Sequence, residues 1–220
     1  MNSHTRPETT AQRNASQSSP YHHGDLRRVL VEAALALVTE EQDWGFSLRE
    51  VARRAGVSHN APYRHFPEKR DLLAALAVAG YEALRVKLVA AAETAEGPED
   101  ELVAIGVAYV QFGTENPARY RLIFGPDLLT GGLGIPASVA EAAQAAKAVL
   151  VDVIARGVQT GRFAVSQDTQ AERDRVVLTA WALVHGLTML LIDGLAGPAL
   201  PPAVSETVTR SLLDGIRKRP

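Results

Sequence analysis

A cluster of cationic and polar side chains lies in one short stretch of the chain, residues 47–70. The stretch carries six Lys or Arg against two Glu, a net charge of +4. His59, Asn60 and Arg64 stand close together within it. Asparagine can pair bidentately with adenine and arginine with guanine, while cationic side chains neutralise phosphates. This combination of residue types favours contact with nucleic acid.

The charge of the whole chain hides this segment. The 220 residues carry 23 Lys and Arg against 25 Asp and Glu, a net charge of −2 with neutral His. That balance, taken alone, argues against a nucleic-acid binder. Residues 71–220 hold 13 positive and 17 negative side chains, a net charge of −4. The cations are therefore concentrated on one short unit.

Two short helices around a tight turn are predicted to position these side chains. Ser47 and Glu50 form a capping-box pattern that opens the first helix. Gly56 permits positive φ in the turn, and Ser58 can cap a second helix that ends near Phe66. The small apolar core of such a unit would contain Val51, Ala52, Ala55, Val57 and Phe66. A plain helical hairpin would share the glycine turn, but the added cap, small residue and cations favour a DNA-binding helix-turn-helix.

At these residues the chain resembles the DNA-binding domain of TetR-family (tetracycline-repressor-like) transcriptional regulators. The resemblance covers residues 21–76 and is carried by Gly-Val-Ser at 56–58, Tyr-x-His-Phe at 63–66 and Lys-x-x-Leu-Leu at 69–73. It implies a three-helix domain with DNA contacts from Arg49, His59, Asn60, Tyr63, Arg64, His65 and Lys69. Ser58, at the start of the second helix, belongs to the same predicted site.

Pro62 departs from the family pattern, which usually has an aliphatic residue before the tyrosine. Proline has no N–H and fits comfortably only in the first turn of a helix. The second helix is therefore predicted to start late or to begin as a tighter turn. Asn60 and Arg64 are assigned to base edges. The side chains suited to phosphates are Tyr63, His65 and Lys69.

The remainder of the chain predicts an all-α fold. Apolar residues recur at helical spacing, no segment alternates convincingly at period two, and Gly and Pro mark the ends of the segments. Helices are predicted from about residue 25 to before Trp44, and at 68–94, 98–115, 117–124, 136–160, 168–194 and 202–217.

Three regions are predicted along the chain. Residues 1–20, rich in Ser, Thr, Gln and Asn, are expected to be a disordered tail. Residues 21–76 form the DNA-binding domain, and residues 77–220 form a larger helical domain for effector binding and dimerisation.

The C-terminal half contains Trp181 followed by His185 and Gly186, which resembles the signature of the WHG subgroup of TetR C-terminal domains. The resemblance covers about residues 98–197 and implies effector binding and dimerisation. Trp181 and His185 lie one turn apart on one helix face, and Gly186 would let another helix come close. His185 is interpreted as a core histidine with a satisfied hydrogen bond, in preference to a ligand contact.

An effector pocket is predicted among the aromatic side chains of the helices between residues 76 and 192. The candidates are Tyr81, Tyr109, Phe112, Tyr120, Phe124, Trp181 and His185, although aromatic residues at helical spacing more often belong to a core. No cluster of Lys or Arg indicates a strongly acidic ligand, so the expected effector is a mostly apolar small molecule.

The longest apolar run, residues 176–192, is short for a membrane span and contains His185. A helix buried between other helices is the preferred interpretation, and no membrane partner is expected. The run is more apolar than one small domain can cover, which favours a homodimer. The family resemblance implies that the last two helices form a four-helix bundle with their symmetry mates. Such a dimer would place two recognition helices about 34–36 Å apart on a palindromic operator in double-stranded DNA.

Several kinds of chemistry are excluded or unsupported. The chain has no Cys, which excludes disulfides, thiolate zinc sites and Fe–S clusters. No H-E-x-x-H, G-x-S-x-G, Walker A or CxxC spacing occurs, so no enzyme activity, cofactor or metal is predicted. The N-terminus has no apolar signal region, which suits a cytoplasmic protein.

The sequence therefore predicts a dimeric transcriptional regulator, most readily a repressor released from its operator by a small molecule. An activator on the same scaffold is one alternative. A helical small-molecule-binding protein or enzyme with vestigial DNA binding is another.

Overall fold

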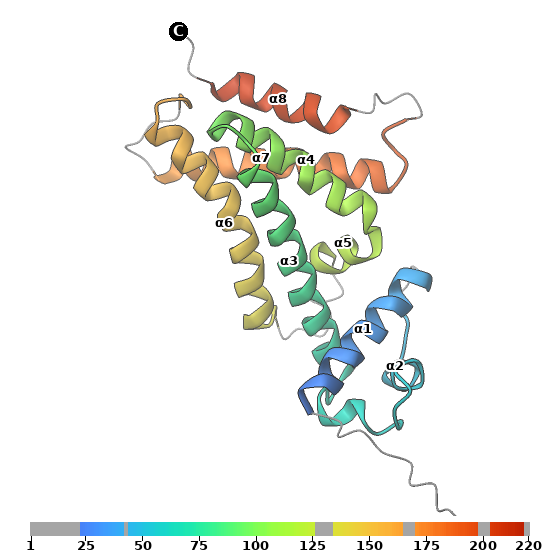
Figure 1. Ribbon diagram of the computed structural model, residues 1–220. Helices are drawn as coiled ribbons and strands as arrows, with labels where there is room; N and C mark the ends of the chain where they lie inside the picture. The colour runs from blue at the N-terminus through green and yellow to red at the C-terminus, as the bar shows by residue number, and fades with distance from the viewer. Residues whose placement is uncertain (1–22, 42–43, 126–133, 165–169, 198–202, 218–220) are drawn as a thin grey trace, which may run out of the picture.

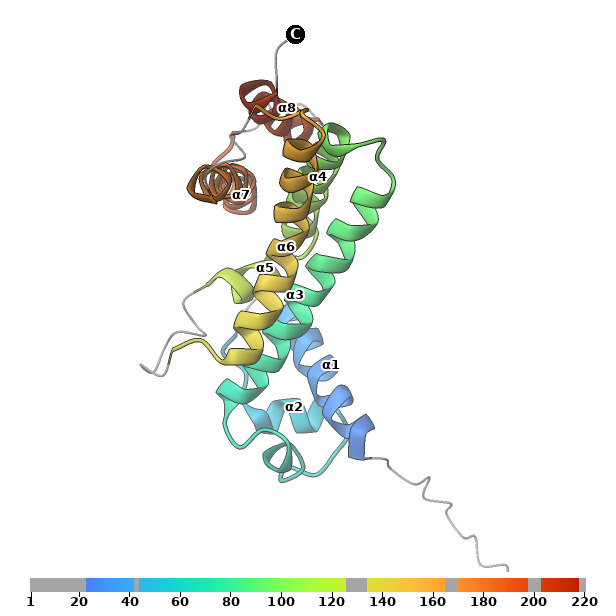
Figure 2. The ribbon, with the colours of Figure 1, turned by 90° about the vertical axis from the view of Figure 1, so that its left-hand side faces the viewer.

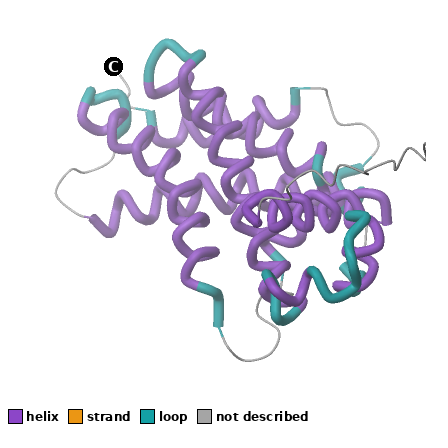
Figure 3. Tube along the Cα trace, turned by 60° about the horizontal axis from the view of Figure 1, so that its bottom comes forward, coloured by secondary structure: helices purple, strands orange, loops and turns teal. Residues whose placement is uncertain are grey.

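The fold is helical throughout the computed structural model, which describes residues 23–41, 44–125, 134–164, 170–197 and 203–217. Those ranges contain no strand (Figure 3), and their one extended pairing is an isolated bridge between Phe163 and Arg217. The elements are α1 (His23–Glu41), α2 (Leu48–Arg54), the 3-10 turn η1 (Pro62–Arg64), α3 (Lys69–Glu93), α4 (Pro98–Glu115), α5 (Pro117–Phe124), α6 (Ala137–Gln159), α7 (Gln170–Ile192) and α8 (Val204–Ile216). The all-α prediction is confirmed. The predicted tail, residues 1–20, lies outside the described residues.

Local signals in the sequence set the starts of three helices. The predicted capping box is present, since the Ser47 hydroxyl accepts from the Glu50 N–H and the Glu50 carboxylate accepts from the Ser47 N–H. Pro98 and Pro117 begin α4 and α5, where a missing N–H costs no helical hydrogen bond. Gly97 precedes α4 with φ of +120°. The helices predicted at 98–115 and 117–124 therefore begin and end as expected.

The helices form an elongated molecule with the predicted DNA-binding unit at one end (Figure 1). There α1, α2 and η1 surround the beginning of α3, with Leu30, Val51 and Phe66 fully buried between them. Helix α3 then runs into the body of the molecule and packs against α4, α5 and α6. Helices α7 and α8 lie across the opposite end (Figures 1 and 2). One helix thus connects both ends of the molecule.

Helix α7 is long and apolar enough to cross a membrane by length and composition. In this chain it packs on α4, α6 and α8, and about 28% of its most apolar stretch is buried. Helix α7 thus lies against other helices, as expected, and one chain covers only part of its apolar surface, also as expected. Leu178 and Leu190 remain 59% and 46% exposed. These exposed leucines are an apolar face that one copy of the chain leaves uncovered.

Candidate functional site

The turn of the helix-turn-helix follows the predicted geometry. Gly56 has φ of +68°, a conformation that costs glycine little. The N–H of Val57 donates to the Ala52 carbonyl over 3.0 Å, which closes the turn. Arg54 donates from Nη1 and Nη2 to the two carboxylate oxygens of Glu40 and so ties α2 to α1. The turn is therefore held by α2, and α2 is held by α1.

The recognition segment, residues 58–66, differs from the predicted α-helix. Most of its hydrogen bonds span three residues, from the Ala61 N–H to the Ser58 carbonyl (2.9 Å) and from the His65 N–H to the Pro62 carbonyl (2.9 Å). One α-helical bond closes the segment, from the Phe66 N–H to the Pro62 carbonyl over 2.8 Å. The physical reason is Pro62, which has no N–H for an α-helical bond and instead starts η1. Ser58 therefore caps no helix, contrary to the prediction, and the expectation of a tighter turn is confirmed.

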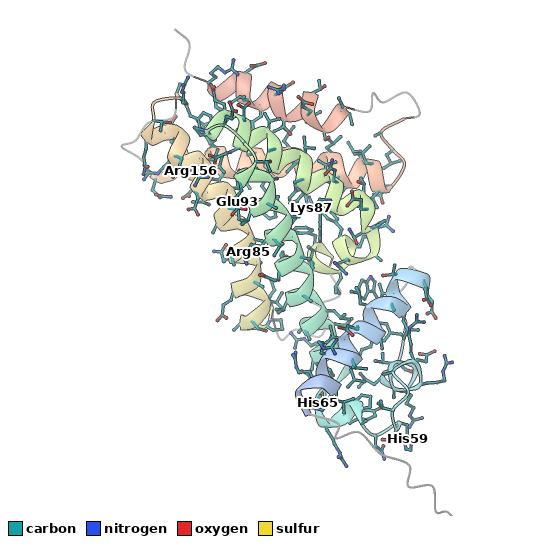
Figure 4. All side chains as sticks on the ribbon, viewed as in Figure 1. His59, His65, Arg85, Lys87, Glu93 and Arg156 are labelled. Atoms are coloured by element: carbon teal, nitrogen blue, oxygen red, sulfur yellow. The ribbon has the colours of Figure 1, made fainter. Side chains whose placement is uncertain are left out.

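Most of the predicted DNA-binding residues are exposed at this end of the molecule. The exposed ones are Arg49, Ser58, His59, Asn60, Tyr63 and Arg64. His65 is half-buried. Figure 4 shows His59 and His65 at the end of the molecule opposite α8. The segment thus presents cationic and amide side chains to solvent, far from α7 and α8.

Lys69 is engaged within the protein. Its ammonium donates to the carbonyl of Trp44, and Nζ lies 4.7 Å from the centre of the Phe46 ring. These contacts fix the start of α3 to the segment between α1 and α2. A phosphate contact by Lys69, as predicted from the resemblance, would have to share or replace them.

A cavity of about 260 Å³ lies between α3, α4, α5, α6, α7 and α8. Most of its wall is apolar, with Leu84, Leu88, Leu102, Ile105, Leu150 and Val184 among the lining residues. Four of the seven predicted pocket residues line it: Tyr81, Tyr109, Phe124 and Trp181. The cavity is therefore suited to an apolar molecule.

The other three predicted pocket residues do not line the cavity. Phe112 is buried in the core. Tyr120 is fully buried and His185 is half-buried, and both lie behind the cavity wall. Both rings lie against Phe124, which does line the cavity: its ring centre lies 4.7 Å from that of Tyr120 and 4.9 Å from that of His185.

A chain of hydrogen bonds joins α4, α5 and α7 behind the cavity. The Trp181 indole N–H donates to the Tyr109 hydroxyl over 3.1 Å. The Tyr109 and Tyr120 hydroxyls lie 3.1 Å apart, and the Tyr120 hydroxyl lies 2.7 Å from His185 Nδ1. The Tyr120 hydroxyl donates to the Tyr109 hydroxyl, and the Tyr109 hydroxyl in turn lies 3.2 Å from His185 Nδ1, so each hydroxyl proton has an acceptor when Nδ1 is unprotonated. This order requires the His185 tautomer with its proton on Nε2.

Burial keeps the side chains of this hydrogen-bond chain neutral. It raises the pKa of Tyr120 to about 12 and the pKa of Tyr109 well above its usual range. Burial also lowers the pKa of His185 below its ordinary value of 6.5. The prediction of a core histidine with a satisfied hydrogen bond agrees with these contacts.

The His185 pKa gives a pH-dependent stability with a defined sign. Below pH 6.5 the unfolded chain binds a proton at this histidine that the folded chain resists, so the free energy of unfolding should fall as the pH falls. Denaturant unfolding of the wild type and of His185→Gln between pH 7.5 and about 5 checks this prediction. The variant should lose this part of the pH dependence. His59→Gln, which changes an exposed histidine, should keep it.

Close helix packing behind the cavity depends on two glycines of α4. A Cβ on Gly113 would lie 2.2 Å from Thr188 Cγ2 of α7, and a Cβ on Gly106 would lie 2.6 Å from Thr209 Oγ1 of α8. Gly186, which was predicted to let another helix approach, is different, because a Cβ added there would meet no atom within 4 Å. That prediction is wrong within one chain, because the face of α7 at Gly186 is not packed against another helix.

The sequence interpretation did not include several residues of the cavity wall. Gln144 and Lys147 reach it from α6, and Thr209 reaches it from α8. Lys147 could have been singled out, because it is one of four lysines in the chain and lies three residues after Gln144. The contribution of α8 depends on how distant helices pack and leaves no local pattern in the sequence.

Both halves of the chain match known families. Residues 30–76 match the model described as bacterial regulatory proteins of the tetR family. Residues 102–215, more than half of the chain, match the model described as the tetracyclin repressor-like C-terminal domain. The chain belongs to the TetR family. TetR-family regulators bind DNA and small-molecule effectors, and the relatives of this one are transcriptional regulators rather than enzymes.

Individual relatives agree with this assignment. A helix-turn-helix transcriptional regulator of Mycobacterium tuberculosis H37Rv is 28% identical over 77% of this chain and 82% of its own. A protein of unknown function from Rhodococcus sp. RHA1 is 31% identical, with a TM-score of 0.79 over 91% of this chain and all of its own. A TetR-family regulator from Marinobacter aquaeolei VT8 is 16% identical, with a TM-score of 0.67 over 89% of this chain and 97% of its own, and supports the fold alone.

Proposed function

We propose that this TetR-family regulator is a homodimeric, cytoplasmic repressor that leaves its operator when a mostly apolar small molecule fills the cavity. The observation that carries the proposal is α3, which begins beside the recognition segment and lines the cavity with Tyr81, Leu84 and Leu88. Residues 21–76 act as the DNA-binding domain and residues 77–220 as the effector-binding and dimerisation domain. Helix α3 crosses the boundary between them.

Helix α3 and its neighbours offer two mechanical links between the cavity and the DNA-binding end. The 25 residues of α3 span about 37 Å at about 1.5 Å per residue. Phe124 lines the cavity at the end of α5, and α5 packs against α1. A ligand that moves Phe124 or the α3 residues would therefore shift α1 and the recognition segment. The coupling is reciprocal, so operator DNA weakens effector binding by the same factor.

The proposed dimer uses the uncovered face of α7. Leu178, Ala182 and Leu190 are exposed there, and the space beside Gly186 is open. Helix α8 packs beside α7 at the same end of the molecule. Pairing of α7 and α8 with their copies would bury the apolar stretch, which makes a dimer interface a better use of α7 than a membrane span.

The assignment of Arg64 to a base edge gives a direct test of DNA reading. Arg64→Ala should reduce discrimination between the operator and random DNA by about tenfold to a hundredfold, because one bidentate base contact contributes about 1–3 kcal/mol. Gel shifts at fixed salt on both DNAs measure the ratio. Arg162→Ala removes the same charge from an exposed position after α6 and should leave the ratio unchanged. An equal loss on both DNAs for Arg64→Ala would refute the base contact.

The regulator function as a whole is tested on DNA upstream of the protein's own gene. Salt-sensitive, sequence-specific binding that is lost when an apolar compound is added, together with lower transcription in the presence of the protein, would support the proposed repressor. Transcription that rises when the protein is added would identify an activator. Absence of specific binding to genomic fragments would contradict the regulatory proposal.

A further inference from the structure

The polar groups of the cavity wall divide into two sets. On the inner side each polar side chain already has a partner within the protein. Tyr81 donates to the Ile123 carbonyl over 2.6 Å, and Thr209 donates to the Ser205 carbonyl over 2.8 Å. Tyr109 and Trp181 belong to the hydrogen-bond chain that ends at His185. This side of the cavity therefore offers no unused donor to a ligand.

The second set lies on α6 and has no partner. Gln144 and Lys147 both line the cavity, both are exposed, and neither takes part in a hydrogen bond or ion pair among the described residues. The other two lysines of the described ranges are engaged, Lys69 by the Trp44 carbonyl and Lys87 by Glu115 at 2.6 Å. The free donors of the wall are thus gathered at its α6 edge, in contact with solvent.

The cavity wall carries a single positive charge. Among the lining residues of the cavity Lys147 carries the one formal charge, and no Asp, Glu, Arg or His lines it. A ligand that fills the apolar interior and reaches this edge would meet one ammonium and one amide N–H₂ group. Both are donors to a carboxylate, and charge-assisted hydrogen bonds of this kind are stronger than neutral ones.

We infer that the effector is a compact apolar monocarboxylate, bound with its hydrocarbon body against Phe124 and Trp181 and its carboxylate at Lys147 and Gln144. This inference rests on the proposed function in using the same cavity, and it adds the chemical class of the ligand. The hydrocarbon body forms no hydrogen bonds, and the polar groups on the inner side need none from it because they already have partners within the protein. The carboxylate stays at the solvent edge, where its desolvation cost is small.

Three probes of one length test the ligand class on the full-length protein. Octanoate, octanol and octylamine are titrated by calorimetry and by the fluorescence of Trp181, in a Trp44→Phe background because the chain has two tryptophans. Octanoate should bind about tenfold more tightly than octanol, with octylamine weakest. The advantage of octanoate should shrink as salt is raised. Equal binding of octanoate and octanol, or binding of none of the three, would overturn the inference.

Variants of Lys147 separate the head-group contact from the shape of the cavity. Lys147→Met should remove the advantage of octanoate and leave octanol binding unchanged, and Lys147→Glu should make octylamine the preferred probe. Lys87→Met, which alters a paired lysine outside the cavity, should keep the wild-type order. Thermal unfolding checks that each variant is folded. A Lys147→Met protein that loses octanol and octanoate equally would show a structural role for the lysine and refute the head-group contact.

Operator release is measured separately, so the two proposals can fail independently. Octanoate binding that depends on Lys147 without operator release would keep the ligand class and contradict the effector mechanism. Operator release by neutral apolar compounds as readily as by carboxylates would keep the mechanism and contradict the ligand class.

Discussion

Replacing Leu178 and Leu190 together by glutamate is expected to convert the proposed dimer into monomers. Both side chains are exposed in one chain and would be buried in the pairing of α7 with its copy. An unpaired carboxylate buried in an apolar interface costs about 3–5 kcal/mol, and each dimer would acquire four of them. Every 1.4 kcal/mol changes an equilibrium constant tenfold, so a dissociation constant raised by at least about a thousandfold is expected.

Loss of the dimer should be visible in mass and in DNA binding. Light scattering after size-exclusion chromatography measures the mass, and gel shifts on a palindromic operator measure the affinity, which should fall at least about a hundredfold because one copy contacts one half-site. Val86→Glu changes a residue that is 54% exposed on α3 and should keep both properties. If the double variant remained dimeric at micromolar concentration, α7 would not be part of the dimer interface.

Removal of Tyr120 is expected to give the largest loss of stability among single substitutions behind the cavity. Tyr120 is fully buried, stacks near Phe124 and His185, and links Tyr109 to His185 through its hydroxyl. Tyr120→Ala should lower the free energy of unfolding by about 3–5 kcal/mol, as for other large aromatic truncations. Tyr120→Phe keeps the ring and should cost about 1–3 kcal/mol, because it removes one hydrogen-bonding group from a buried chain.

A second tyrosine supplies the matched control. Tyr63 is 43% exposed in the recognition segment, so Tyr63→Ala should change the free energy of unfolding by no more than about 0.5 kcal/mol. Urea unfolding at pH 7.5 compares the three variants with the wild type. If Tyr120→Ala cost no more than Tyr63→Ala, the hydrogen-bonded chain would have no part in stability.

Prediction from sequence succeeded where a local signal decides the structure. The capping box of Ser47 and Glu50 begins α2 as expected, and Pro98 and Pro117 begin α4 and α5. Each signal acts through a hydrogen bond, or the absence of one, within four residues. The recognition segment is a further case in which a local signal was sufficient. Pro62 predicted a tighter turn, and η1 is that turn.

The arrangement behind the cavity could not be predicted in this way. Tyr109, Tyr120 and His185 stand on three different helices, and their contacts depend on how α4, α5 and α7 cross. Aromatic type alone selected Phe112 together with Tyr109, although one faces the core and the other lines the cavity. A glycine in the sequence likewise does not reveal its neighbour, because Gly113 packs against Thr188 while Gly186 faces open space.

Because the recognition segment is short, one copy of the protein can recognise only a short DNA sequence. Selecting one site among about a million competing sites takes about 8 kcal/mol of discrimination. A good base contact supplies about 1–3 kcal/mol, and a single 3-10 turn with its preceding residues presents few side chains that can make one, chiefly His59, Asn60 and Arg64. The base contacts of one copy would therefore not supply enough discrimination to select a single site in the genome. Two copies at a fixed spacing make twice as many base contacts. The distance between the two half-sites then adds to sequence specificity in a way that the base contacts of one copy cannot.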